Sequence, residues 1–84
     1  MRYTFEVLVS LKPGLADPQG AAVASALPAL GWSNVTQVRV GKHVAVTLEA
    51  GSEEEARTQV EAIARRLLAN PVIEEFRIVA GEAG

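Results

Sequence analysis

Residues 11–20 read Leu11-Lys12-Pro13-Gly14-Leu15-Ala16-Asp17-Pro18-Gln19-Gly20, and they predict the end of a strand, a turn and the start of a helix. Proline cannot donate to a strand ladder, and glycine permits the turn. Asp17 is a favoured N-cap, and Pro18 suits the first helical position. The stretch contains no nucleophile paired with a base, no metal-ligand set and no phosphate cradle. A well-specified loop without chemistry indicates a contact surface rather than an active site.

The segments on either side of this stretch have the periodicity of a strand and a helix. Alternation of apolar and polar residues over Tyr3–Leu11 predicts the first strand. Helical spacing after Asp17 predicts a buried stripe of Val23, Leu27 and Leu30, with Ala22 and Ala26. Pro28 predicts a kink or an irregular last turn, and Gly31 a left-handed cap.

The rest of the chain predicts two middle strands, a second helix and a last strand. Ser52 and Glu55 form a capping box, which marks the second helix start. Arg65 and Arg66 suit its end, and Asn70-Pro71 stops it. The predicted segments are strands at 35–40 and 44–50, a helix from Ser52, a strand from about Val72 to Ala80, and a flexible tail at 81–84.

The connection between the two middle strands has a register problem. A two-residue Gly41-Lys42 turn would place Val40 opposite His43. The apolar sets of the two strands would then lie on opposite faces, which a period of two does not allow. We therefore predict a three-residue Gly41-Lys42-His43 loop, in preference to a bulge.

The order β-α-β-β-α-β predicts one α+β domain over residues 1–84. Right-handed crossovers give a two-layer, ferredoxin-like arrangement, with two helices on one face of a four-stranded, largely antiparallel sheet. The open face mixes apolar and polar side chains, which favours packing against a second protomer. Its predicted residues are Leu8, Val35, Ala45, Ile73 and Val79 among Glu6, Gln37, Arg39, Thr47 and Arg77.

Composition narrows the function classes. The chain has 84 residues, 49% of them hydrophobic and 5% aromatic, with no cysteine and a net charge of -2. A domain this small has a marginal core and no disulfide to support it, so association is the common remaining source of stability. The charge argues against a nucleic-acid partner. The chain lacks a signal-peptide pattern and an apolar run long enough to span a membrane, so we expect a soluble, cytoplasmic protein.

Isolated reactive residues are best explained structurally. His43 is the one histidine, and it has neither a cysteine nor a second histidine to join it. A Ser-His-Asp set is disfavoured because the one Asp of the chain has a capping role. Gly14 and Gly20 lack P-loop spacing, and an anion beside Lys12 at the helix start would compete with the capping carboxylate.

The positive charge near the middle of the chain leaves two interpretations open. Arg39, Gly41 and Lys42 place two cations around a predicted hairpin end. They could contact a nucleotide or an acidic partner surface, or form a solvated turn. Local sequence favours neither interpretation.

Three phrases together resemble the PurS family, the small subunit of phosphoribosylformylglycinamidine (FGAM) synthase. They are Leu11-Lys12-Pro13-Gly14 with Asp17-Pro18-Gln19-Gly20, then Val38-Arg39-Val40-Gly41-Lys42, then Leu67-Leu68-Ala69-Asn70-Pro71-Val72-Ile73-Glu74. The resemblance covers about Tyr3 to Ile78. Ala16, where the family often has a larger apolar residue, and Pro28 depart from the pattern.

The resemblance implies a non-catalytic subunit in de novo purine biosynthesis. In this family PurQ releases ammonia from glutamine, and PurL uses ATP and magnesium to place the nitrogen on formylglycinamide ribonucleotide. PurS would bind no cofactor, form a homodimer or higher oligomer, bridge PurL and PurQ and assist ammonia transfer. The family pattern implies partner-contact residues at Lys12, Asp17, Gln19, Gly20, Arg39, Gly41 and Lys42.

Two other function classes share the predicted fold. A small-molecule-binding regulatory module of the ACT type has the same element order and oligomerises. An acylphosphatase-like enzyme would need an anion-binding Arg loop and a catalytic Asn, which the first loop lacks.

Overall fold

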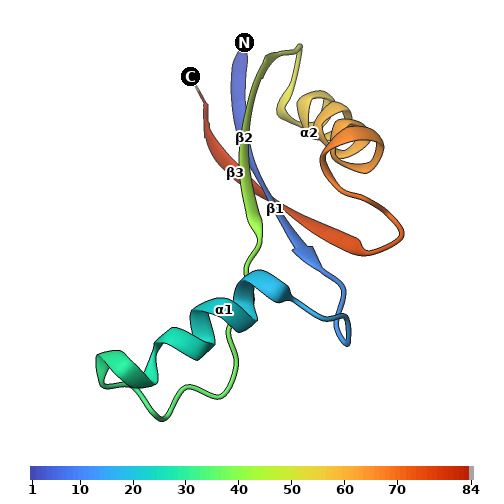
Figure 1. Ribbon diagram of the computed structural model, residues 1–84. Helices are drawn as coiled ribbons and strands as arrows, with labels where there is room; N and C mark the ends of the chain where they lie inside the picture. The colour runs from blue at the N-terminus through green and yellow to red at the C-terminus, as the bar shows by residue number, and fades with distance from the viewer. Residues whose placement is uncertain (84) are drawn as a thin grey trace.

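The computed structural model describes residues 1–83, which form an antiparallel sheet, two α-helices and two short helical segments (Figure 1). In chain order they are β1 (Arg2–Leu11), α1 (Pro18–Ala26), a 3₁₀ turn (Pro28–Leu30), β2 (Lys42–Glu49), α2 (Glu53–Ile63), a π-helical segment (Ala64–Leu68) and β3 (Glu74–Ala83). The predicted α+β class is confirmed, with an antiparallel sheet and two helices.

The sheet has the strand order β2-β1-β3, so the first strand of the chain lies in the middle. β2 is antiparallel to β1, with Val9 opposite Lys42 and Arg2 opposite Glu49. β3 is antiparallel to the other edge of β1, with Leu11 opposite Glu74, and the register shifts between Tyr3 and Phe5. Both neighbours of β1 therefore come from distant parts of the chain.

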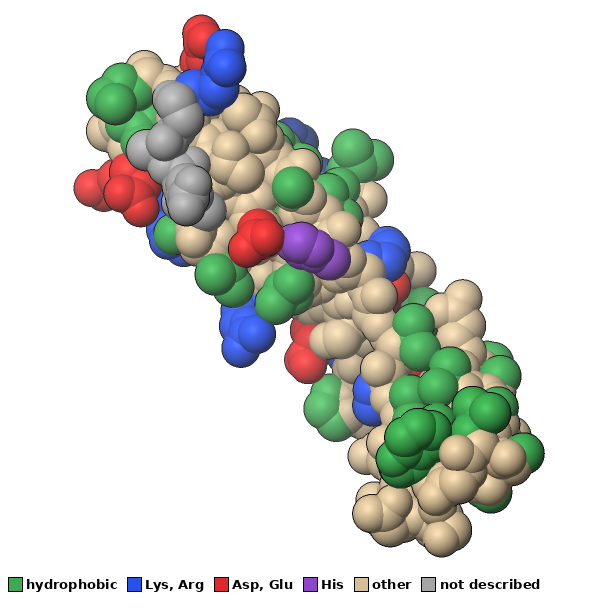
Figure 2. Space-filling model, turned by 90° about the vertical axis from the view of Figure 1, so that its left-hand side faces the viewer, with side chains coloured by type: hydrophobic (Ala, Val, Ile, Leu, Met, Phe, Trp, Pro, Cys, Tyr) green, Lys and Arg blue, Asp and Glu red, His purple; other side chains and the backbone are tan. Residues whose placement is uncertain are grey.

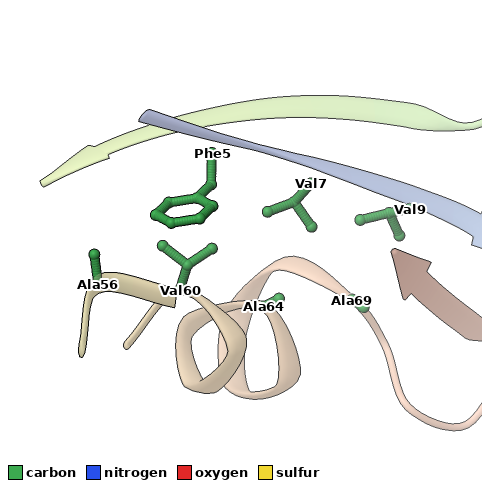
Figure 3. Close-up of a cluster of buried hydrophobic side chains, with 7 residues drawn as sticks. All are labelled: Phe5, Val7, Val9, Ala56, Val60, Ala64 and Ala69. Atoms are coloured by element: carbon green, nitrogen blue, oxygen red, sulfur yellow. The ribbon is translucent and has the colours of Figure 1, made fainter. Parts of the chain in front are cut away.

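The core lies between the sheet and α2 (Figure 3). β1 contributes Phe5, Val7 and Val9, each at most 2% exposed. Their alternate positions point to one face because side chains alternate along a strand. Small side chains on the helical layer let it lie close to the sheet: Ala56, Val60, Ala64 and Ala69.

Local capping signals are confirmed. The Ser52 hydroxyl accepts a hydrogen bond from Glu55 N at 3.1 Å and caps α2. α1 ends at Ala26, and Pro28 lies in a 3₁₀ turn closed by Gly31 at φ 104°. The irregular last turn predicted from Pro28 is therefore present, because proline has no N–H to continue the helix.

The prediction that both helices cover the sheet is wrong for α1. α1 and the 3₁₀ turn project from one end of the sheet as an arm (residues 18–41, with the extended segment that returns from them; Figure 1). The apolar residues predicted to form a buried stripe are largely exposed to solvent. Val23 is 46% exposed and Leu30 is 67% exposed. The chain is accordingly elongated, with a radius of gyration of 16.4 Å, against about 12 Å for a compact chain of this length.

The prediction of four strands is also wrong within one chain. Residues 35–40 form no strand, so the sheet of the described residues has three strands. The predicted Gly41-Lys42-His43 loop is absent, because Lys42 and His43 are the first residues of β2 and pair with Val9 and Leu8. Because Lys42 and His43 already belong to β2, there is no hairpin at Gly41, and the register conflict of a tight turn does not arise.

The end of the chain differs from the predicted tail over residues 81–84. β3 continues to Ala83, where it pairs with Tyr3. Gly84 lies outside the described residues.

Candidate functional site

The three phrases singled out in the sequence meet at one place, which we call the junction: residues 11–20, 38–42 and 68–74 where the arm joins the sheet. Lys12 N donates to Ile73 O at 2.9 Å, and the Lys12 ammonium donates to Pro71 O at 2.8 Å. These bonds join the first phrase to the third. The Lys42 ammonium donates to Leu68 O at 2.9 Å and joins the second phrase to the third.

Asp17 joins the first phrase to the second. Its Oδ1 accepts from Gly20 N and its Oδ2 from Val40 N, each at 2.8 Å. One carboxylate therefore caps α1 and also holds the extended segment before β2. The Gly20 hydrogen bond, followed by the Val40 bond, lowers the pKa of the Asp17 carboxyl, because both donors favour the charged form.

Arg39 closes the turn of residues 12–15 from outside. Its guanidinium donates to Leu15 O at 2.8 Å and to Lys12 O at 3.3 Å. Backbone carbonyls of a turn have few partners of their own, so a fork of N–H donors can satisfy several of them together. Arg39 therefore stabilises the shape of the turn.

Two glycines allow close backbone approach at the junction. A Cβ on Gly20 would collide with the carbonyl oxygen of Val38, and one on Gly41 would lie 2.5 Å from Val9 O. Both positions require glycine because a backbone atom occupies the place of the side chain. The two residues set the distance between α1, the extended segment and β1.

A cleft of about 520 Å³ opens beside the junction. Its polar lining includes Ser10, Gln19, Lys42 and Glu74. Lys42 is 3.8 Å from Glu74, so the charges in the cleft are partly paired. Within residues 1–83 no hydrogen bond joins the Ser10 hydroxyl to Lys42 or Glu74, which bond instead to Leu68 O and Asn70 N. The lining therefore offers polar groups for recognition of a polar surface.

His43 lies on the sheet face opposite α2, not in a turn as predicted. Its Nε2 is 3.0 Å from Glu6 Oε1, and both side chains are about half exposed. Figure 2 shows the histidine beside an acidic side chain on this face. Within residues 1–83 there is no cluster of three side chains that could hold a metal ion. No helix in the same part of the chain is long and apolar enough to cross a membrane.

The residues predicted as partner contacts are therefore close together, and most of them have contacts within the chain. Lys12, Asp17, Arg39 and Lys42 each bond to another part of the junction. Gln19 is exposed and lines the cleft. Whether these residues touch another subunit stays a prediction.

Sequence reasoning missed the groups that complete the junction. These are mainly the backbone carbonyls of Leu68 and Pro71 and the carboxylate of Glu74. A carbonyl carries no sequence signal, and its partners lie 26 and 59 positions away. The one sequence signal for these groups is that residues 67–74 belong to the same family pattern as the other two phrases.

Comparison with known proteins assigns the chain to a protein family. The sequence matches the family "PurS: Phosphoribosylformylglycinamidine (FGAM) synthase" over residues 4–82. The chain belongs to the PurS family. It is 45% identical over 74 residues to the FGAM synthase subunit PurS of Synechocystis, covering 88% of this chain and 74% of that protein. It is 41% identical over 75 residues to the PurS subunit of Bacillus subtilis, covering 89% and 88%.

Solved structures extend the PurS likeness to the whole fold. PurS of Thermus thermophilus superimposes with a TM-score of 0.88 at 39% identity and covers 100% of both chains. A chain in the structure of PurLQS from Thermotoga maritima superimposes with a TM-score of 0.89 at 27% identity, covering 96% of this chain and 99% of that one. The projecting arm is included in these overlaps, because they span nearly the entire chain.

Proposed function

We propose that this chain is the non-catalytic PurS subunit of FGAM synthase in de novo purine biosynthesis. The observation that carries the proposal is the family match over residues 4–82, together with the overlap with a chain of PurLQS. The enzyme converts formylglycinamide ribonucleotide, glutamine and ATP to FGAM. The PurS match favours this function over an ACT-type regulatory module or an acylphosphatase.

The subunit acts by binding its partner subunits and catalyses no reaction itself. It bridges a PurL synthetase and a PurQ glutaminase and assists the transfer of ammonia between them, in the cytoplasm. ATP and magnesium act on PurL, and this chain binds no cofactor. The cleft supports this role because its polar groups, among them Gln19 and Ser10, offer hydrogen bonds without reactive chemistry.

The junction is the proposed seat of partner recognition. The side chains of Lys12 and Arg39 donate hydrogen bonds to backbone carbonyls of the same chain. They therefore fix the shape of the surface, and neighbouring residues make the direct contact with the partner. Exposed apolar side chains also lie at the junction, with Leu15 39% and Val72 77% exposed. Apolar residues beside satisfied polar groups are typical of the contact surfaces of protein complexes.

The subunit also associates with itself. The arm carries exposed apolar side chains, including Trp32 at 55% exposure, and Figure 2 shows apolar side chains gathered at the arm end. Contiguous apolar surface of this kind marks an interaction site. The four-stranded layer predicted from sequence would then be completed by a second copy.

Complex formation tests the proposal. The chain is mixed with the PurL and PurQ proteins of the same organism, with glutamine, magnesium and nucleotide present, and the mixture is analysed by size-exclusion chromatography with light scattering. We expect one species that contains all three proteins. Separate elution of this chain under conditions in which PurL and PurQ are folded and active would contradict the proposal.

A further inference from the structure

Two turns are tied together where β1 ends and β3 begins, and we call residues 12–15 and 70–73 the double turn. The backbone N–H of Lys12 donates to Ile73 O at 2.9 Å, and the Lys12 ammonium donates to Pro71 O at 2.8 Å. These bonds join the two turns across 59 positions of the sequence. The double turn is part of the junction and lies outside the arm.

The double turn exposes apolar side chains to solvent. Val72 is 77% exposed, Ile73 is 40% exposed and Leu15 is 39% exposed. Pro13 and Pro71 are exposed as well. Turns are usually built from small or polar residues and proline, so large apolar side chains in both turns are not explained by turn chemistry. Exposed apolar surface of this kind is typical of an interaction site.

The backbone N–H groups of the second turn already have acceptors within the chain. Asn70 N donates to Glu74 Oε1 at 2.7 Å. Val72 N donates to Asn70 Oδ1 at 3.0 Å, and Ile73 N donates to Asn70 O at 3.2 Å. The remaining residue of this turn, Pro71, has no N–H. A partner that covers residues 70–73 therefore leaves none of their N–H groups without an acceptor, which avoids a large cost of burying backbone.

The first turn is held in one shape by Arg39. The guanidinium donates to Leu15 O at 2.8 Å and to Lys12 O at 3.3 Å. Leu15 N also donates to Lys12 O, at 3.3 Å. Both turns therefore keep their form without a partner. A surface that is ordered before binding loses less conformational freedom on association, which favours affinity.

Two cations border the double turn. Neither Lys12 nor Arg39 takes part in an ion pair among the described residues. Asp17 lies near Arg39, but its carboxylate is held by two backbone N–H groups. Glu75 lines the same hollow as Lys12 without pairing with it. An ammonium has three N–H donors and a guanidinium has five, so both cations retain donors after their bonds to carbonyls.

We propose that the double turn docks into an apolar hollow bordered by carboxylates on a partner subunit of FGAM synthase. The inference rests on the proposed function and names the contact surface within the junction. Val72 and Leu15 fill the hollow, while the positive charge of Lys12 and Arg39 attracts the carboxylates at its rim. The arm supplies separate apolar surface for a second copy, so the double turn is left for a different protein.

Val72→Glu tests the apolar centre of the contact. The new carboxylate is desolvated in the hollow and repelled by the carboxylates at its rim. The dissociation constant of this chain from PurL and PurQ, measured by biolayer interferometry with glutamine, magnesium and nucleotide present, should rise about tenfold or more. Leu67→Glu is the matched control, because Leu67 is 78% exposed and lies outside the junction, and it should stay within about threefold. Leu15→Glu is a second variant with the same expected result as Val72→Glu. Equal effects of the Val72 and Leu67 variants would overturn the inference.

Carbodiimide coupling tests the carboxylates at the rim, because the reagent joins an amine to a carboxylate in contact with it. The chain has two lysines, Lys12 and Lys42. Lys42 is 3.8 Å from Glu74, so an internal link between them shows that the reagent has reacted. In the complex, mass spectrometry should find Lys12 joined to an Asp or Glu of PurL or PurQ. The internal link without any link from Lys12 to a partner subunit would overturn the proposed chemistry of the partner surface.

The outcomes separate this inference from the proposed function. A wild-type chain that forms no complex with PurL and PurQ would contradict both. A complex that forms equally well with wild type and with Val72→Glu would contradict the docking of the double turn alone. Light scattering covers the remaining occupant: if Val72→Glu abolishes self-association and leaves the complex with PurL and PurQ intact, a second copy covers the double turn and the inference is overturned.

Discussion

The carboxylate of Asp17 accepts a hydrogen bond from the backbone N–H of Val40 at 2.8 Å, across 23 positions of the chain. The same carboxylate caps α1 through Gly20 N. One side chain therefore sets the place of the arm against the sheet.

The Asp17 bonds predict a pH-dependent stability. The folded-state pKa is lowered from 3.8, so the stabilisation is present above that value and is lost as pH falls through the folded pKa. Asp17→Asn should lower the free energy of unfolding at pH 7, and the difference from wild type should shrink below about pH 4. Urea unfolding at a series of pH values and one protein concentration measures it. A difference that is unchanged at pH 2 would show that the charge of Asp17 does not stabilise the fold.

Gly20→Ala tests the close approach of α1 to the extended segment. The new methyl group meets the carbonyl oxygen of Val38, a backbone atom that cannot rotate away. We expect a loss of about 1–3 kcal/mol in the free energy of unfolding. Gly51→Ala is the control, since its nearest neighbour is the flexible Glu55 carboxylate at 3.0 Å, and it should change stability by about 0.5 kcal/mol or less. Similar losses in both variants would mean that the approach is not tight.

Val60→Ala tests the core between α2 and the sheet. Val60 is fully buried against the side chains of β1. Removing two methyl groups should cost about 2 kcal/mol, from lost burial and the cavity left behind. Val72→Ala makes the same chemical change at a site that is 77% exposed, and it should have little effect on unfolding. If the two variants unfold at the same denaturant concentration, the packing of α2 on β1 is not what stabilises the domain.

His43→Gln tests whether the histidine has a chemical role. The His43–Glu6 pair is exposed at 3.0 Å, and exposed pairs contribute less than about 1 kcal/mol. Stability should change by no more than that, and glutamine-dependent FGAM formation by the reconstituted complex should stay within about twofold of wild type. A large loss of activity in a folded variant would assign chemistry to His43.

The sequence predicted those features that depend on neighbours within one helical turn. The Asp17 and Ser52 caps, the irregular turn at Pro28 and the left-handed Gly31 are all present. Each is decided by contacts among a few consecutive residues, which periodicity and capping preferences describe well.

The errors concern distant contacts. The alternation over residues 35–40 predicts a strand, but these residues pair with no strand in the described part of the chain. The helical period predicts that the stripe with Val23 and Leu30 packs on the sheet, whereas both side chains are exposed on the projecting arm. The periodicity of apolar side chains predicts which face of an element is buried. It does not predict which element or molecule buries that face.

The residues predicted as partner contacts lie together at the junction, and their contact with another subunit stays a prediction. Lys12, Arg39 and Lys42 were grouped by resemblance as partner contacts. Their bonds to carbonyls 59, 24 and 26 positions away make them builders of the junction. Such bonds depend on tertiary placement, and no local pattern records them.

The source of nitrogen gives the most direct test of the central claim, that this chain acts as the PurS subunit by contact. FGAM formation by the PurL and PurQ proteins of the same organism is measured with glutamine and, separately, with ammonium salt, each with and without this chain. We predict that glutamine-dependent formation requires this chain and that ammonium-dependent formation by PurL does not. Equal glutamine-dependent rates with and without the chain would contradict the account.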